Sequence, residues 1–483
     1  MKEILIINPP IRLDDKPRNI PHGLGIIANK IRQEIGITPN FLDMNAYRLT
    51  NEELAVVLEH MKFDIVMIGG IASAYRKIIE ITDIVKRINP EAVVIVGGYV
   101  AMPEEVHHTL FDHSKVDILC LGEGEKTVVE IVKVLSSKWI SNLSKVAGIC
   151  YRGGWKIRYT RPRPLIHSLD MESVLPAYDL LPMNIYLRNP VCGWGKDTDF
   201  ISSRGCAYKC SFCYQPWEGK FRSHSAEYIT NALVYLKTRY DIDFVSFQDD
   251  EFMTDLNRVK EFCERKSKVL PDLLWSCTGR VNIIAKRPEI VQTMKDVGCV
   301  LISYGFESGS QEMLDSMHKQ IKIKDMEKVV EISRKNGLPI PASFIIGMPG
   351  ETEATCEETL EFCLNNNLPL DSLMFATPYP GTEIFGFAME TGRIDRKNLH
   401  NFLLKLGDAR EFLINLTDNF TDTELVMKRE EMMYTARENY NNYISKDEIM
   451  EKTKELYGDI LSKNKIDDKE IEHKMKHGGI LTF

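Results

Sequence analysis

The stretch "SSRGCAYKCSFCY", residues 202–214, places three cysteines, Cys206, Cys210 and Cys213, within eight residues. A structural zinc site needs four protein ligands and usually gathers them as two close pairs. No second pair accompanies this Cys-x3-Cys-x2-Cys spacing. A four-iron cluster can be held by one thiolate on each of three irons, which leaves the fourth iron an exchangeable position. The spacing therefore favours an iron–sulfur cluster with one open iron.

Zinc remains the alternative metal, because His224 or the more distant Cys192 could supply a fourth ligand. The chain has 11 cysteines, an odd number, and its N-terminus lacks a signal-peptide cleavage site. This pattern favours reduced thiols over a disulfide framework. We interpret most of the cysteines outside the stretch as small buried hydrophobic residues.

Six strand-and-helix units make up residues 196–395 and begin with the strand that precedes the three cysteines. Short apolar runs, each followed by a helical pattern, predict the strands: "DFISSRG", "FVSFQDD", "LLWSCTG", "VLISYGFE", "ASFIIGMP" and "LMFATPYP". Such a succession predicts an α/β fold with a partial (βα)6 barrel related to the TIM barrel. Chemistry is then expected on the loops that follow the strands.

The first 140 residues predict a doubly wound parallel sheet. Apolar runs such as "EILIINPP", "FDIVMIGG", "AVVIVGGYV" and "VDILCLGEGE" end in Gly, Pro or Asp, as strands buried on both faces do. Ligands of such sheets bind beyond the carboxyl ends of the strands, where glycine lets the backbone approach them closely. Residues 141–195 read as a hairpin and a linker, and residues 396–483 as a helical C-terminal region.

Composition describes an ordinary globular protein, with 483 residues of which 44% are hydrophobic and 27% charged. A net charge of −8 gives no overall attraction for nucleic acid, so a nucleic-acid partner is not expected. No run of eighteen apolar residues predicts a membrane span. We expect a cytoplasmic protein that acts on a small molecule or a peptide.

With Phe212 as its aromatic residue, the cysteine stretch resembles the Cys-x3-Cys-x-aromatic-Cys signature of the radical S-adenosylmethionine (SAM) superfamily. The resemblance implies that Cys206, Cys210 and Cys213 hold a 4Fe-4S cluster, which an electron donor such as flavodoxin or ferredoxin reduces. The reduced cluster then cleaves SAM to methionine and a 5′-deoxyadenosyl radical that abstracts a substrate hydrogen atom.

Further segments resemble that family's SAM-binding segments in the same order along the barrel. "FQDDEF" would receive the SAM amine, "GRVN" the carboxylate, "YGFESGS" the ribose and "IIGMPGE" the adenine. A surface salt bridge is the competing interpretation of Arg280, and packing that of the tyrosines near the cluster. The SAM-binding residues so predicted are Tyr208, Phe212, Asp249, Asp250, Glu251, Arg280, Glu307, Ser308, Gly347, Met348 and Pro349.

The N-terminal sheet resembles the cobalamin-binding domain found in one branch of this superfamily. Many cobalamin modules carry a cobalt-ligating histidine in the loop after the first strand, but here that loop, "NPPIRLDDKPRN", has none. We therefore expect cobalamin to lack a histidine ligand from this domain. Asp43 is expected only to line the same edge. The predicted cobalamin-binding residues are Asn8, Pro9, Pro10, Gly70, Ala72, Ser73, Gly97, Gly98, Tyr99, Gly122, Glu123, Gly124 and Glu125.

The two cofactors together imply a cobalamin-dependent radical SAM enzyme, most simply a methyltransferase for an unactivated carbon or phosphorus centre. An enzyme of the same branch that forms a ring or rearranges carbon bonds is the first alternative. A non-catalytic metal-binding scaffold is the second. A tRNA methylthiotransferase is less favoured, because only Cys120 and Cys150 precede residue 151. The sequence identifies no acid or base for the substrate.

Overall fold

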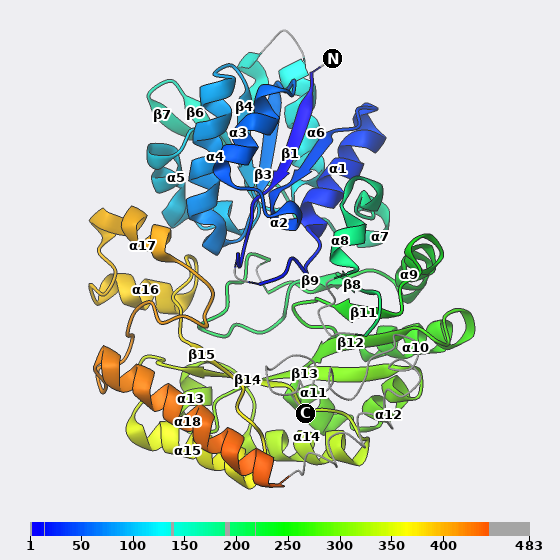
Figure 1. The fold of residues 1–483 in the computed structure, drawn as a ribbon, viewed down its shortest axis with the longest axis vertical. Coiled ribbons are helices and arrows are strands. Elements are labelled where there is room, and N and C mark those ends of the chain that lie inside the picture. The colour runs from blue at the N-terminus through cyan, green and yellow to red at the C-terminus, as the bar shows by residue number, and fades with distance from the viewer. Residues whose placement is uncertain (1, 14, 137–139, 189–193, 218, 444–483) are drawn as a thin grey trace. The chain divides into compact units, whose positions relative to one another are not determined.

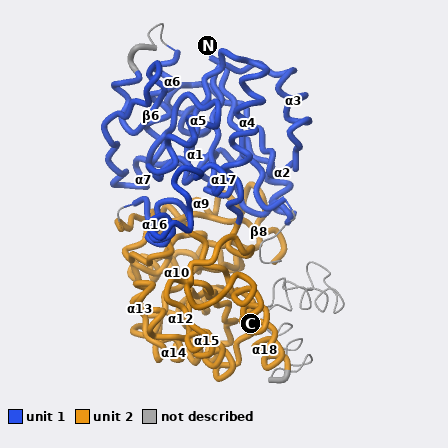
Figure 2. Tube along the Cα trace, turned by 90° about the vertical axis from the view of Figure 1, so that its left-hand side faces the viewer, with its two compact units in different colours: residues 1–189, 214–218, 379–407 blue, residues 190–213, 219–378, 408–483 orange. Residues whose placement is uncertain are grey.

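The computed structural model describes the chain except residues 1, 14, 137–139, 189–193, 218 and 444–483. Cys192 and the end of the predicted C-terminal region therefore lie outside the described residues. The chain divides into two compact units, and neither is one continuous segment (Figure 2). The first unit comprises residues 1–189, 214–218 and 379–407, and the second comprises residues 190–213, 219–378 and 408–483.

The first unit is built on a sheet whose five leading strands are parallel. They lie in the order β2-β1-β3-β4-β5, the strand order of flavodoxin-like folds. The predicted doubly wound sheet is thereby confirmed. The strands are β1 (Ile4–Asn8), β2 (Asn40–Asp43), β3 (Ile65–Gly69), β4 (Val93–Gly97) and β5 (Ile118–Cys120).

Helices cover both faces of this sheet, which explains why its strands are apolar on both sides (Figure 1). One face packs against α1 and α6 through a core that includes Ile6, Ile31, Met67 and Ile131. The helices are α1 (His22–Ile35), α2 (Met44–Tyr47), α3 (Asn51–Glu59), α4 (Tyr75–Ile88), α5 (His107–His113) and α6 (Gly124–Ser136).

The predicted hairpin is part of the same sheet. Strands β6 (Ile149–Gly153) and β7 (Lys156–Tyr159) add to β5 in antiparallel fashion and form the edge of the sheet. Two short helices follow, α7 (Leu169–Glu172) and α8 (Met183–Tyr186). The hairpin thus extends the first sheet, whereas the sequence indicated only a local pair of strands.

The second unit contains a six-stranded, all-parallel sheet in the order β15-β14-β13-β12-β11-β8. Each strand therefore lies beside its sequence neighbour, as in a barrel, but β8 and β15 do not pair with each other. The predicted six units and their order are confirmed as an open, partial barrel. The strands are β8 (Asp197–Phe200), β11 (Phe244–Phe247), β12 (Leu274–Gly279), β13 (Cys299–Glu307), β14 (Ala342–Ile346) and β15 (Ser372–Phe375).

Helices follow the strands of this sheet along the chain (Figure 1). They are α9 (Ala226–Tyr240), α10 (Leu256–Val269), α11 (Val281–Lys286), α12 (Glu289–Lys295), α13 (Gln311–Ser316), α14 (Ile323–Lys335) and α15 (Glu353–Asn365). A short antiparallel ladder pairs β9 (Ser203–Arg204), before the three cysteines, with β10 (Arg222–Ser223), after them. The ladder closes the loop that contains the cysteines.

The C-terminal helices belong to different units. Helices α16 (Glu383–Glu390) and α17 (Leu399–Lys405) lie in the first unit, where Arg76 of α4 donates to the Leu404 carbonyl. Helix α18 (Asp422–Tyr443) lies in the second unit, where Arg429 donates to the Leu373 carbonyl. Within the described part of the chain, no helix is long and apolar enough to cross a bilayer.

Candidate functional site

The three cysteines occupy a loop after β8 whose base is closed by the β9–β10 ladder. Cys206 is buried, Cys210 is half-buried and Cys213 is exposed, and all three are free thiols. A turn inside the loop is fixed by the Cys213 amide, which donates to the Cys210 carbonyl at 3.0 Å. Burial raises the pKa of the Cys206 thiol, so this thiol stays protonated and is a poor nucleophile unless a metal takes the place of its proton.

The donor set of this loop fits an iron–sulfur cluster better than a single ion. Among the described residues, no three His, Cys, Asp or Glu side chains are gathered as one metal ion would require. In a four-iron cluster each cysteine holds a different iron, so the thiols need not converge on one point. Three sulfur donors, one of them open to solvent, suit that arrangement.

Two aromatic residues of the loop are each covered by a cation. The Arg280 guanidinium lies 3.3 Å from the centre of the Tyr208 ring, and the Lys319 ammonium lies 5.9 Å from that of Phe212. Asn282 donates to the Tyr208 hydroxyl at 3.1 Å. Such cation–π contacts strengthen when they are shielded from water. The aromatic residues of the loop therefore help to fix its conformation.

Arg280 is buried, which rules out the surface salt bridge considered from the sequence. It donates to the backbone carbonyl of Lys319, and its Nε is buried without a hydrogen-bond partner among the described residues. A buried guanidinium nitrogen without a partner is costly, so a bound carboxylate would satisfy it. Its predicted contact with the SAM carboxylate stays a prediction that this geometry supports.

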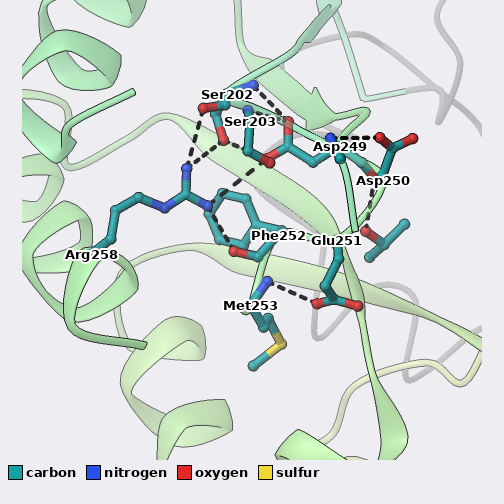
Figure 3. Close-up of polar contacts among 10 residues, drawn as sticks. Ser202, Ser203, Asp249, Asp250, Glu251, Phe252, Met253 and Arg258 are labelled. Atoms are coloured by element: carbon teal, nitrogen blue, oxygen red, sulfur yellow. Dashed lines mark hydrogen bonds and ion pairs between the residues drawn. The ribbon is translucent and has the colours of Figure 1, made fainter. Parts of the chain in front are cut away.

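The acids after β11 include two that bind the backbone at the start of the cysteine loop (Figure 3). Asp249 accepts hydrogen bonds from the Ser202 and Ser203 amides at 2.6 and 3.0 Å and from the Ser202 hydroxyl. Arg258 lies 3.9 Å from the same carboxylate. Burial raises the pKa of Asp249, whereas Arg258 and the Ser202 bonds act to lower it. Asp249 therefore holds the start of the loop, and its predicted contact with the SAM amine stays a prediction.

The next two acids differ in their partners. Asp250 accepts a hydrogen bond from the amide of Gly205, the residue before Cys206, at 2.9 Å. Glu251 accepts one from the Met253 amide at 2.9 Å (Figure 3), and burial raises its pKa to about 7. Because one carboxylate oxygen of Glu251 accepts no hydrogen bond within the described residues, this residue is the acid best placed to meet a cationic ligand.

The segment after β13 combines backbone strain with a buried ion pair. Glu307 has a left-handed backbone, with φ of 66°, which a residue with a side chain seldom adopts. Its carboxylate contacts the Lys319 ammonium at 2.6 Å, and both side chains are only 9% exposed. The Ser308 hydroxyl, in contrast, is fully buried against Thr359 of α15 at 3.0 Å. Of the two predicted ribose ligands, Glu307 has the more suitable position.

The predicted adenine segment, which contains Gly347, Met348 and Pro349, is shaped by a carboxylate that the sequence did not single out. Glu351 is buried and accepts hydrogen bonds from the amides of Gly347 and Met348. Gly347 itself has φ of 89°, a conformation that favours glycine. Burial raises the pKa of Glu351 to about 7. The turn is therefore held by a carboxyl group that prefers to be protonated.

We expect a Glu351→Gln variant to remove a pH-dependent loss of stability. Because the folded-state pKa is about 7 and the ordinary value is 4.5, the wild-type free energy of unfolding falls as pH rises between these values. Urea titrations from pH 4 to pH 8 should show the Gln variant gaining about 3 kcal/mol over the wild type. Glu357→Gln, at an exposed position of the helix that follows the turn, α15, is the control and should show no comparable gain.

The cobalamin edge of the first sheet has glycines where close approach is needed. Gly98 has φ of 83°, and a Cβ on it would lie 2.8 Å from the Gly70 carbonyl oxygen. Gly122 has φ of 79° with open space around the position of a Cβ. Exposed Ile71 and Tyr99 add apolar surface beside these glycines. This combination fits a bulky, largely apolar ring system.

The polar residues predicted for cobalamin are mostly engaged by the protein. Asn8 donates to Asp43 at 2.8 Å, and Asp43 also accepts from Tyr186 at 2.6 Å. Glu123 accepts from the Ile166 amide and Glu125 from the Ser173 hydroxyl. The linker therefore binds the strand ends. The cobalamin contacts of these side chains stay predictions, and the glycines and Tyr99 are the stronger candidates.

The loop that lacks a histidine is closed by an arginine. Arg48 donates to the carbonyls of Ile11, Arg12 and Asp15 and to the side chain of Asn45. Its own backbone is left-handed, with φ of 53°. Four contacts from one guanidinium fix a loop with little secondary structure of its own. No local pattern predicts this role, because Arg48 lies more than 30 residues from the carbonyls that it binds.

An aromatic cluster in the first unit joins three distant segments. The Tyr99 ring lies 6.1 Å from Tyr214 and 6.4 Å from Trp217, with edge-on geometry. Tyr214 directly follows the last cysteine of the loop, and Gly381 of "PYPGTE" lies against its ring. Gly381 has φ of 84°. The glycine of this segment is thus required by close packing as well as by its backbone conformation.

We expect Gly381→Ala to destabilise this cluster strongly. A Cβ at this position would overlap the Tyr214 ring, and the left-handed backbone adds a cost of about 1–2 kcal/mol. Together these should lower the free energy of unfolding of the first unit by about 2–4 kcal/mol. Thermal unfolding followed by circular dichroism would measure the effect. Gly392→Ala, also left-handed but with open space around it, isolates the backbone contribution.

Comparisons with known protein families match both halves of the chain. Residues 200–363 match the model of the radical SAM superfamily, and residues 15–132 match the B12 binding domain. The first range contains the cysteine loop and the strand ends described above. The second contains most of the glycine-bearing edge.

Individual relatives agree with these matches. An uncharacterized methyltransferase of Pyrococcus horikoshii is 32% identical over 394 residues, which are 80% of this chain and 83% of the other. The anaerobic magnesium-protoporphyrin IX monomethyl ester cyclase of Rubrivivax gelatinosus is 26% identical over 79% of this chain and 69% of its own. The solved structure of OxsB, a cobalamin-dependent SAM radical enzyme with aqua-cobalamin and SAM bound, shares the fold with a TM-score of 0.64 at 18% identity. That match covers 84% of this chain but 55% of OxsB.

Proposed function

Since this chain belongs to the cobalamin-binding branch of the radical SAM superfamily, we propose that it transfers a methyl group from SAM to an unactivated carbon or phosphorus centre. The observation that carries the proposal is that one chain combines a three-cysteine loop on a partial barrel with a glycine-bearing edge of a B12-type sheet. The methyltransferase of P. horikoshii, which matches over most of its length, supports methylation in particular.

The cofactors supply the difficult chemistry when bound: the cluster supplies the electron that cleaves SAM, and cobalamin carries the methyl group. The protein's own groups then have two tasks. The Arg280 guanidinium and the Glu251 carboxyl group are the groups expected to meet the carboxylate and the amine of SAM, and so to orient its methionine portion. Burial raises the pKa of Glu251 to about 7, and a bound ammonium would favour its ionised form. Asp249 and Asp250 hold the cysteine loop at both ends of the segment 202–205.

A second candidate is a ring-forming or carbon-rearranging reaction with the same cofactors. The relative from R. gelatinosus is a cyclase and matches over a similar share of this chain, which favours keeping this candidate. The two reactions differ in the fate of the SAM methyl group. A methyl transfer leaves it on the product, whereas cyclisation does not.

The deciding experiment uses the reconstituted full chain with SAM labelled in its methyl group and an extract of small metabolites as substrate source. Methylation predicts label in a product together with formation of 5′-deoxyadenosine. Accumulation of 5′-deoxyadenosine without label in any product would overturn the methyl-transfer proposal in favour of the second candidate. A Cys210→Ala chain treated identically controls for label carried by SAM itself.

The remaining assignments are also proposals. We place the protein in the cytoplasm, with a small-molecule or peptide substrate and a flavodoxin or ferredoxin as electron donor. Support for a small molecule comes from the cyclase relative, whose named substrate is a porphyrin ester. Each purified carrier would be tested for reduction of the cluster, measured as the loss of the visible absorbance of the cluster. The carrier that reduces it would be identified as the donor.

A further inference from the structure

Lys319 is the least expected charged residue of the site. It lies between α13 and α14, is 8% exposed, and was not indicated by any motif. A buried lysine needs a compensating partner, which Glu307 supplies at 2.6 Å. The residues on both sides of it, His318 and Gln320, have left-handed backbones with φ of 53° and 58°. One member of this ion pair, Glu307, and both sequence neighbours of the other member therefore have left-handed backbones.

Left-handed residues with side chains each cost about 1–2 kcal/mol and persist where the surrounding structure imposes them. Here the strain presents the lysine inward, toward the strand ends. A buried ion pair is by itself weak evidence for a gain in stability, because the desolvation of both charges can outweigh their attraction. The arrangement thus indicates that the position of the Lys319 charge matters beyond stability.

The segment 317–319 contacts the cysteine loop in three ways. The Met317 carbonyl accepts from the amide of Ser211 at 3.0 Å. The Lys319 ammonium lies 5.9 Å from the ring of Phe212. The Lys319 carbonyl accepts from Arg280, whose guanidinium covers Tyr208. Ser211 and Phe212 stand between the second and third cysteines, so the segment supports the part of the loop that would hold the cluster.

We propose that Lys319 is a positioning residue whose buried charge, balanced by Glu307, sets the reduction potential of the cluster and fixes Phe212 within the cysteine loop. A nearby positive charge in a poorly screened site favours the reduced cluster, which carries one more negative charge. A nearby carboxylate acts in the opposite direction. The two charges therefore shift the reduction potential of the cluster in opposite directions. This proposal does not depend on whether the substrate is methylated.

The opposite signs of the two charges give the test. In EPR-monitored redox titrations of the reconstituted full chain, Lys319→Met should lower the midpoint potential and Glu307→Gln should raise it. We expect the ratio of reduced to oxidised cluster at the wild-type midpoint to change about tenfold in each direction, or 59 mV for one electron. The double variant and Lys319→Arg should both return close to the wild-type value.

A merely structural ion pair would behave differently. Loss of packing would lower the cluster content of both single variants and shift their potentials in the same direction, and that result would overturn the proposal. Lys266→Met is the matched control, because Lys266 is also buried but lies near the end of α10, where it donates to the Pro271 carbonyl. If Lys319→Met fails to hold a cluster, a lowered potential in Glu307→Gln alone still refutes the assignment.

Discussion

A Cys210→Ala variant should lose the iron–sulfur absorbance of the reconstituted protein and form 5′-deoxyadenosine at least about 1,000-fold more slowly than the wild type. Cys210 is the middle one of three cysteines in a loop whose ends are closed by β9 and β10. With only two thiolates left, two of the four irons of the cluster would lack a protein ligand instead of one. Iron and sulfide content, visible absorbance and product formation measure the effect together.

The matched control for this experiment is Cys363→Ala, which removes a buried thiol from α15, outside the cysteine stretch. It should keep the full cluster content and cost only the stability of a small cavity, about 1–2 kcal/mol. A Cys210→Ala chain that still bound four irons, or a wild-type chain that bound one zinc ion in their place, would contradict the assignment of the loop.

The second large effect concerns stability. Replacing Asp249 by alanine should lower the free energy of unfolding of the second unit by about 3–5 kcal/mol, because the buried Arg258 guanidinium loses its counter-charge. The amides of Ser202 and Ser203 lose their acceptor at the same time. Urea titration of the cofactor-free protein, followed by circular dichroism, measures the loss.

Asp250→Asn provides the contrast, since within the described residues Asp250 accepts one hydrogen bond, from the Gly205 amide, and makes no ion pair. Its stability cost should stay below about 1.5 kcal/mol. Equal costs for the two variants would show that the network around Asp249 contributes little (Figure 3).

Much of the fold was predictable because both sheets are parallel and buried on their faces. Each apolar run of residues 1–140 and 196–395 that predicts a strand forms a strand in the structure. The strands of the barrel also lie side by side in the order in which they follow one another along the chain. The edge hairpin was different. Its pairing with β5 depends on contacts between Ile118 and Tyr151, which no local pattern encodes. Likewise, no local signal placed residues 379–407 with the first unit.

The site was predictable where chemistry is local and unpredictable where it is not. Cysteine spacing is a property of eight consecutive residues, and the B12-type edge follows from strand ends. In contrast, the Ser202 and Ser203 amides that bind Asp249 lie more than 40 residues away in the sequence, and the proposed role of Lys319 depends on its burial against Glu307. Glu351 accepts a hydrogen bond from the nearby Gly347 amide, but its burial depends on the surrounding fold. Side-chain environments of this kind depend on the completed fold.

The interleaving of the two units has a practical consequence for dissecting the molecule. A fragment that ends at residue 189 would lack Tyr214 and His400. It would expose the Tyr99 ring further and would remove the His400 ring that stacks on His113. Such a truncation should aggregate, and transplanting the B12-type half onto another barrel would require three grafts. Recombination during evolution faces the same obstacle, so the two halves are expected to be inherited together.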